Sequence, residues 1–114
     1  MHIYDLDTPA LVVDLDVLER NIADMARRCA EIGIPLRVHT KTHKTPEIAK
    51  MQMAAGACGI VCQKVGEAEV MAKAGLRDIL IPYNIVGIQK VRRLTALVQM
   101  ATITAAVDSV DTAQ

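Results

Sequence analysis

The sequence predicts an α/β fold of about four successive βα units whose strands run parallel in one sheet. Short strand-like runs alternate with helical segments at intervals of roughly twenty residues. The run Ile79-Leu80-Ile81 is apolar on both faces, as is typical of a strand covered on both sides. A doubly wound open sheet and part of a (β/α)₈ barrel both fit this pattern. The chain has no Gly-x-Gly-x-x-Gly motif after its first strand, which weakens the dinucleotide-binding form of the open sheet.

The first expected element is a helix that begins at the capping segment Asp14-Leu15-Asp16 and ends at Gly33. Its apolar residues follow one another at steps of four, three, four and three, and they are Leu18, Ile22, Met25, Cys29 and Ile32. This spacing places them on one face of an α-helix.

Strands and helices then alternate along the rest of the chain. We expect strands over 35–41, 59–63, 78–83 and 102–107, and helices over 46–55, 66–74 and 88–98. The segment Thr45-Pro46-Glu47 is a helix start, with a cap, a proline at the first helical position and an acid in the first turn. Asp108 or Ser109 is expected to cap a further helix. A complete barrel needs about 250 residues, so this chain of 114 residues corresponds to roughly half of one.

Composition excludes several classes of protein. Thirteen basic residues balance thirteen acidic ones, so there is no charge excess of the kind that binds nucleic acid or an anionic membrane. No apolar run approaches the length that spans a bilayer, and the N-terminus lacks a basic segment followed by an apolar one. The three cysteines indicate reduced thiols and a cytoplasmic protein. Cys58 and Cys62 are not expected to bind a metal, because Cys62 lies in a strand-like run where small buried cysteines are common.

The segment Arg37–Lys44 is the most informative part of the chain. It places Lys41 at the end of a short apolar run, between His39 and His43. A lysine at a strand end beside titratable groups is a candidate for Schiff-base chemistry, which requires a neutral amine. The alternative is a solvated basic loop, because lysine and arginine are mostly exposed. Lys44 is a competing candidate, but it lies past the expected strand end.

Four separated motifs, in order, resemble one family. Asp7–Asp16 is similar to the opening of fold-type III pyridoxal-phosphate enzymes, the alanine racemase N-terminal superfamily. The segments 37–44, 62–69 and 79–84 resemble the cofactor-lysine motif and the next two strand ends of its D-threonine aldolase and D-serine dehydratase branch. Val38 stands where the branch usually has proline, which a strand residue does not require.

The resemblance implies that residues 1–114 are the N-terminal part, about four βα units, of a pyridoxal-phosphate-binding (β/α)₈ barrel. It implies that Lys41 forms the Schiff base with pyridoxal 5'-phosphate and can later serve as a general base near Cα. Members of the family are longer and add a C-terminal β domain, which carries a divalent metal (Mn, Mg or Zn) and much of the substrate pocket. That domain and the metal ligands are absent from these 114 residues.

Two further residues are expected to contact the cofactor. His39 is two residues before Lys41 in the expected strand, so both would share one face and point into the barrel mouth; a buried core histidine is the alternative. Gln63 ends the next strand and can both donate and accept hydrogen bonds. Tyr83 and Asn84 end the third strand, where a structural role is the stronger expectation. No phosphate-binding loop is visible, and barrels often build that site from the seventh and eighth strands.

By resemblance, the expected function is cleavage of β-hydroxy D-amino acids by a pyridoxal-phosphate lyase, either by retro-aldol cleavage as in D-threonine aldolase or by β-elimination as in D-serine dehydratase. The alternatives are an amino-acid racemase of the same superfamily, a non-catalytic carrier of the cofactor, and an inactive fragment. We expect a homodimer with a small-molecule substrate and no nucleic-acid or membrane partner. Alone, the 114-residue chain is expected to be inactive, because the groups that orient the substrate lie elsewhere.

Overall fold

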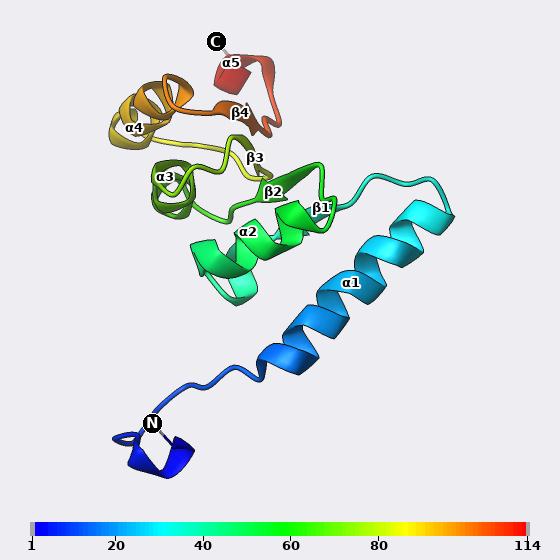
Figure 1. The fold of residues 1–114 in the computed structure, drawn as a ribbon. Coiled ribbons are helices and arrows are strands. Elements are labelled where there is room, and N and C mark those ends of the chain that lie inside the picture. Colours follow the sequence, from blue (N-terminus) through cyan, green and yellow to red (C-terminus); the bar gives the residue numbers. More distant parts are fainter. Residues whose placement is uncertain (1, 114) are drawn as a thin grey trace.

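The computed structural model describes residues 2–113, which form one four-stranded parallel sheet in the order β1-β2-β3-β4 (Figure 1). The strands are β1 (Arg37–His39), β2 (Gly59–Val61), β3 (Asp78–Ile81) and β4 (Thr102–Ala105). The helices are α1 (Leu15–Glu31), α2 (Pro46–Ala54), α3 (Val65–Lys73), α4 (Ile88–Val98) and α5 (Val110–Ala113), with 3₁₀ turns η1 (Ile3–Asp5) and η2 (Thr40–Thr42). The strand order follows the sequence without the reversal that marks a doubly wound sheet, so these strands have the topology of a barrel segment.

The helix boundaries follow the predicted start and stop signals closely. Asp14 caps α1, with its Oδ1 accepting a hydrogen bond from the backbone N–H of Val17 at 3.1 Å. Gly33 follows this helix with a φ of +68°, the left-handed conformation that glycine adopts easily. Pro46 occupies the first turn of α2, as predicted. Before α5, the Ser109 hydroxyl accepts a hydrogen bond from the backbone N–H of Thr112, which fits the expected cap.

All four strands end two residues earlier than the sequence pattern indicates. The most consequential case is β1, which was expected to run to Lys41 but ends at His39, with Lys41 in the 3₁₀ turn η2. Within this turn the backbone N–H of Lys41 donates to the side chain of His39 instead of continuing the strand ladder. The expectation that His39 and Lys41 lie in one strand and share a face is therefore wrong, because His39 is the last residue of β1 and Lys41 lies in η2.

The hydrophobic core lies between the sheet and the helices that cover one of its faces. Val38, Ile60, Ile79 and Ile81 point to this face and are buried. Helices α2, α3 and α4 lie on this side of the sheet (Figure 1), and they contribute buried residues such as Ala49, Ala68 and Leu97. Because side chains alternate along a strand, the neighbouring positions form the opposite face, which is the interior side of a barrel.

An ion pair crosses this opposite face. The guanidinium of Arg37 on β1 donates to the Asp78 carboxylate on β3 at 2.7 Å, across the intervening strand β2. Gly59 of β2 is paired with Arg37 in the register, and a Cβ added there would overlap the guanidinium. The absence of a side chain at Gly59 therefore lets Arg37 reach Asp78, and this polar contact holds three strands together at one level.

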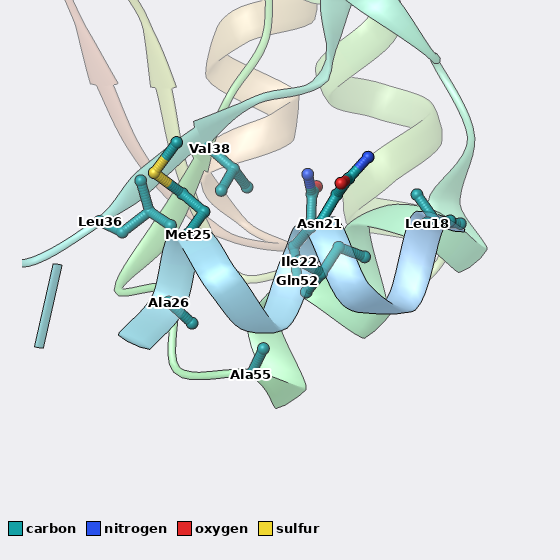
Figure 2. A pocket seen from close by; sticks show the side chains of 9 residues that line it. All are labelled: Leu18, Asn21, Ile22, Met25, Ala26, Leu36, Val38, Gln52 and Ala55. Atoms are coloured by element: carbon teal, nitrogen blue, oxygen red, sulfur yellow. The ribbon is translucent and has the colours of Figure 1, made fainter. Parts of the chain in front are cut away.

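Helix α1 lies at the periphery of the structure beside α2 (Figure 1), and none of its residues is buried. Its apolar face lines a groove with Leu36, Val38, Gln52 and Ala55 (Figure 2). The radius of gyration is 16.6 Å, whereas a compact domain of 100 residues has about 13 Å. The groove contains none of the predicted site residues. Among residues 2–113, no helix is long and apolar enough to cross a membrane.

Replacing Gly59 with alanine tests the role of this glycine. The new Cβ forces the flexible Arg37 guanidinium away from Asp78, so we expect the free energy of unfolding to fall by about 0.2–1 kcal/mol, the usual contribution of a partly exposed ion pair. Chemical denaturation of the protein that carries this chain measures the change. In an Arg37→Ala background the same substitution should cost much less, because no guanidinium occupies the space. An equal cost in both backgrounds would refute the explanation.

Candidate active site

Lys41 is carried by a turn that is fixed to the neighbouring strand. Thr40, only 1% exposed, donates its hydroxyl hydrogen to the carbonyl oxygen of Val61 on β2 at 3.0 Å. The carbonyl of Thr40 accepts hydrogen bonds from the backbone N–H groups of His43 and Lys44, the latter at 2.8 Å. The side chain of Lys41 itself is exposed. The backbone at Lys41 is thus held in place at the carboxyl edge of the sheet, while its amine remains accessible.

His39 closes the turn on its other side. Its Nδ1 accepts a hydrogen bond from the backbone N–H of Lys41 at 3.3 Å. Burial lowers the pKa of His39, and the positive charge of Lys41 lowers it further. At neutral pH the ring is therefore uncharged, and its proton lies on Nε2, because Nδ1 acts as an acceptor. That Nε2 is buried and has no hydrogen-bond partner among residues 2–113.

His43 repeats this arrangement on the far side of the turn. Its Nδ1 accepts from the backbone N–H of Thr45 at 3.0 Å, and burial lowers its pKa. Its Nε2 is also buried without a partner in the described part of the chain. Gln52 on α2 lies beside the His43 ring, because it raises the pKa of His43 against the larger effect of burial, and its Oε1 is likewise buried without a partner in the described residues.

Gln63 lies at the end of the neighbouring strand, as predicted. Its side-chain Oε1 is also a buried polar atom with no partner in residues 2–113. It lines a cleft of about 540 Å³ between the loops that follow β2 and β3, together with Tyr83 and Asn84. The structure therefore brings Gln63 together with these two predicted strand-end residues, whereas His39 and Lys41 do not line this cleft.

Sequence reasoning missed the connection made by Glu67. This residue lies in the first turn of α3, and its Oε2 accepts a hydrogen bond from the backbone N–H of Gln63 at 2.8 Å. Its Oε1 lies 3.4 Å from the Nζ of Lys44, whose side chain is 61% exposed. The signal for the first contact was visible as an acid early in a helix, which commonly binds backbone N–H groups there. The contact with Lys44 joins residues far apart in sequence and has no local signal.

The unpartnered atoms of His39 and Gln63 allow a test of the implied cofactor. Pyridoxal phosphate is an aromatic ring with a phenolic oxygen, a ring nitrogen and a phosphate, so it offers both acceptors and polar edges. The N–H of His39 and the amide oxygen of Gln63, which lie at the carboxyl ends of neighbouring strands with Lys41, fit a ligand of this kind. In residues 2–113, no group of three or more His, Cys, Asp or Glu side chains is placed to hold a metal ion.

Barrel enzymes place their chemistry at the carboxyl edge of a parallel sheet. This chain has a parallel sheet with a lysine and unpartnered polar groups at that edge. Comparison with known families gives a specific result. The chain belongs to the family described as alanine racemase, N-terminal domain, whose model matches residues 13–114. The predicted family is thereby confirmed.

Individual relatives agree with the predicted branch. A D-threonine aldolase from Arthrobacter sp. is 44% identical over 104 residues, which are 91% of this chain and 27% of that protein. A 3-hydroxy-D-aspartate aldolase from Paracoccus denitrificans is 40% identical over 108 residues, 93% of this chain and 28% of the relative. The chain therefore spans less than a third of the length of these curated relatives.

Solved structures confirm the predicted barrel segment. D-threonine aldolase from Filomicrobium marinum matches with a TM-score of 0.93 and 45% identity, covering 96% of this chain and 30% of that one. D-threo-3-hydroxyaspartate dehydratase from Delftia sp. matches with a TM-score of 0.87 and 40% identity, covering 95% and 28%.

The lowered pKa of His43 predicts a pH-dependent contribution to stability. Between its folded pKa and about 6.5, the unfolded chain binds more protons than the folded one, so the free energy of unfolding falls as the pH drops through this window. The substitution His43→Asn removes the titrating group but keeps an acceptor for Thr45. The stability advantage of the wild type over this variant should shrink between pH 7.5 and pH 5. Urea unfolding at several pH values measures it, and an advantage that grows on acidification would contradict the prediction.

Proposed function

We propose that this chain is the cofactor-bearing part of a pyridoxal-phosphate lyase that acts on β-hydroxy D-amino acids, with Lys41 as the lysine that binds the cofactor. The observation that carries the proposal is the fixed turn that presents Lys41 at the carboxyl edge of the sheet, where His39 and Gln63 each have a buried polar atom without a partner in the described residues. The names of the relatives, D-threonine aldolase and 3-hydroxy-D-aspartate aldolase, supply the class of substrate.

In this proposal each residue has a distinct task. Lys41 holds the cofactor covalently through its accessible amine, and His39 and Gln63 bind its polar edges. When bound, the cofactor supplies an electron sink for the pair released at the substrate Cα. Once the substrate amine has displaced it, Lys41 is the base in this chain that can exchange a proton with the substrate. The neutral His39 keeps its Nε2 hydrogen available as a donor, because its lowered pKa disfavours the charged ring.

The lyase reaction has two possible forms, and the relatives include both. The two aldolases match over 91% and 93% of this chain, and the solved D-threo-3-hydroxyaspartate dehydratase matches over 95% of it. Cleavage of D-threonine breaks the Cα–Cβ bond and gives glycine and acetaldehyde. Elimination from D-serine gives pyruvate and ammonia instead.

We also propose that the complete protein contains a divalent metal that assists at the β-hydroxyl, either as a Lewis acid or by lowering its pKa. A variant of D-threo-3-hydroxyaspartate dehydratase has been solved in a metal-free form, which supports a metal in this group of proteins. Its ligands, together with the rest of the barrel and a C-terminal β domain, would lie outside residues 1–114. The resemblance further supports a homodimer, and the cysteine content supports a cytoplasmic location.

The activity of the full-length protein tests the proposal. We expect metal-dependent release of glycine and acetaldehyde from D-threonine, suppressed by a chelator. Lys41→Ala should abolish both the turnover and the visible absorbance of bound cofactor, whereas Lys44→Ala should largely retain the absorbance. Pyruvate from D-serine without acetaldehyde would select the elimination reaction. Racemised alanine with neither product would overturn the lyase assignment in favour of a racemase.

A further inference from the structure

Glu67 joins the two loops that carry the proposed cofactor residues. One carboxylate oxygen accepts from the backbone N–H of Gln63 at 2.8 Å, and the other lies 3.4 Å from the Nζ of Lys44. Gln63 follows β2, whereas Lys44 ends the turn that follows β1 and holds Lys41. A single side chain of α3 therefore contacts the ends of two neighbouring strands.

The environment of Glu67 makes these contacts consequential. Its side chain is only 12% exposed, and a carboxylate removed from water requires partners that replace its hydration. The backbone N–H of Gln63 and the ammonium of Lys44 are such partners. The charge of Glu67 also reaches the neighbouring groups, because it raises the pKa of His39 against the stronger effect of burial.

The backbone conformation of Lys44 is a second reason why its contact with Glu67 matters. Its φ is +50°, which is a left-handed conformation that residues with a Cβ adopt at a cost. Its backbone N–H closes the turn by donating to the Thr40 carbonyl at 2.8 Å. In this conformation the Nζ of Lys44, whose side chain is 61% exposed, lies 3.4 Å from the Glu67 carboxylate. This contact links the turn that presents Lys41 to α3.

We propose that Glu67 is a positioning residue that fixes the Lys41 turn relative to Gln63. Its own role is to hold the two loops in register, without contact to the substrate. This inference rests on the proposed function, in which Lys41 and Gln63 bind the same cofactor. A carboxylate that sets their separation preorganises the site and reduces the cost of binding.

Glu69 provides a matched control in the same helix. Its carboxylate forms two short hydrogen bonds with the Arg93 guanidinium, at 2.7 and 2.6 Å, and connects α3 to α4. This ion pair has better geometry than that of Glu67, but it involves neither strand-end loop. If ion pairs of α3 act only by stabilising the fold, then Glu69→Ala should have at least as large an effect as Glu67→Ala.

Two measurements on the full-length protein test the proposal. The first is the equilibrium affinity for pyridoxal phosphate, read from its visible absorbance. The second is hydrogen exchange of the backbone amides of residues 41–45 and 63 in the cofactor-free protein, which reports the loops without any cofactor chemistry. The variants are Glu67→Ala, Glu67→Gln, Lys44→Asn and Glu69→Ala. Glutamine keeps an acceptor for Gln63, and asparagine tolerates the left-handed backbone while removing the cation.

We expect Glu67→Ala to weaken cofactor affinity about tenfold, because it leaves a partly buried N–H of Gln63 without a partner and removes the ion pair with Lys44. Glu67→Gln and Lys44→Asn should each weaken it about twofold to fivefold, as for a partly exposed ion pair. The double variant Glu67→Gln/Lys44→Asn should lose about as much cofactor affinity as either single variant, because both substitutions remove the same ion pair. Amides 41–45 should exchange faster in all of these variants, and Glu69→Ala should change neither readout.

Wild-type affinity and exchange in Glu67→Ala, or equal losses in Glu69→Ala, would overturn the positioning role while leaving Lys41 as the cofactor lysine. If Glu67→Ala does not fold, then Glu67→Gln and Lys44→Asn decide by the same readouts. If the wild-type protein binds no pyridoxal phosphate, the proposed function fails and the positioning role fails with it.

Discussion

The hydrogen bond from the Thr40 hydroxyl to the Val61 carbonyl is the contact on which the rest of the site depends. It is buried, and it ties the residue before Lys41 to the end of the neighbouring strand. Since a buried hydroxyl must be satisfied, the chain turns at Thr40 instead of continuing as a strand. Lys41 then emerges from a tight turn whose backbone is fixed on both sides, by His39 before it and by Lys44 after it. A reactive side chain on a rigid base loses little entropy when it engages a ligand.

The two faces of the sheet beneath this turn have different roles. One face buries Val38, Ile60 and Ile79 against the helices and supplies the hydrophobic stabilisation. The other carries the Arg37–Asp78 ion pair, which needs the missing side chain of Gly59. Because the strands are held at this polar level, their carboxyl ends stay aligned. The residues that follow β1, β2 and β3 consequently meet at one edge, where parallel α/β proteins place their sites.

The sequence was sufficient for the kinds of elements, their order and the identity of the candidate lysine. Apolar periodicity, caps such as Asp14, and glycines at helix ends are local signals, and the structure follows them. The strand ends were placed too late, because strand-like residues continue into turns whose hydrogen bonds come from another strand, as at Thr40. The pairing of Glu67 with Lys44 was likewise invisible, since it joins residues brought together only by the fold. The predicted roles of His39 and Gln63 as cofactor contacts stay predictions. Each side chain has one buried polar atom without a hydrogen-bond partner among residues 2–113.

The central claim is that Lys41 is the residue that binds pyridoxal phosphate. Borohydride reduction of the full-length protein with the cofactor, followed by proteolysis and mass mapping, tests this most directly, because reduction makes the attachment permanent. The expected result is a single cofactor label on the peptide that contains Lys41, located at that residue by fragmentation. Label found mainly on Lys44 or Lys64, or no label at all, would contradict the claim.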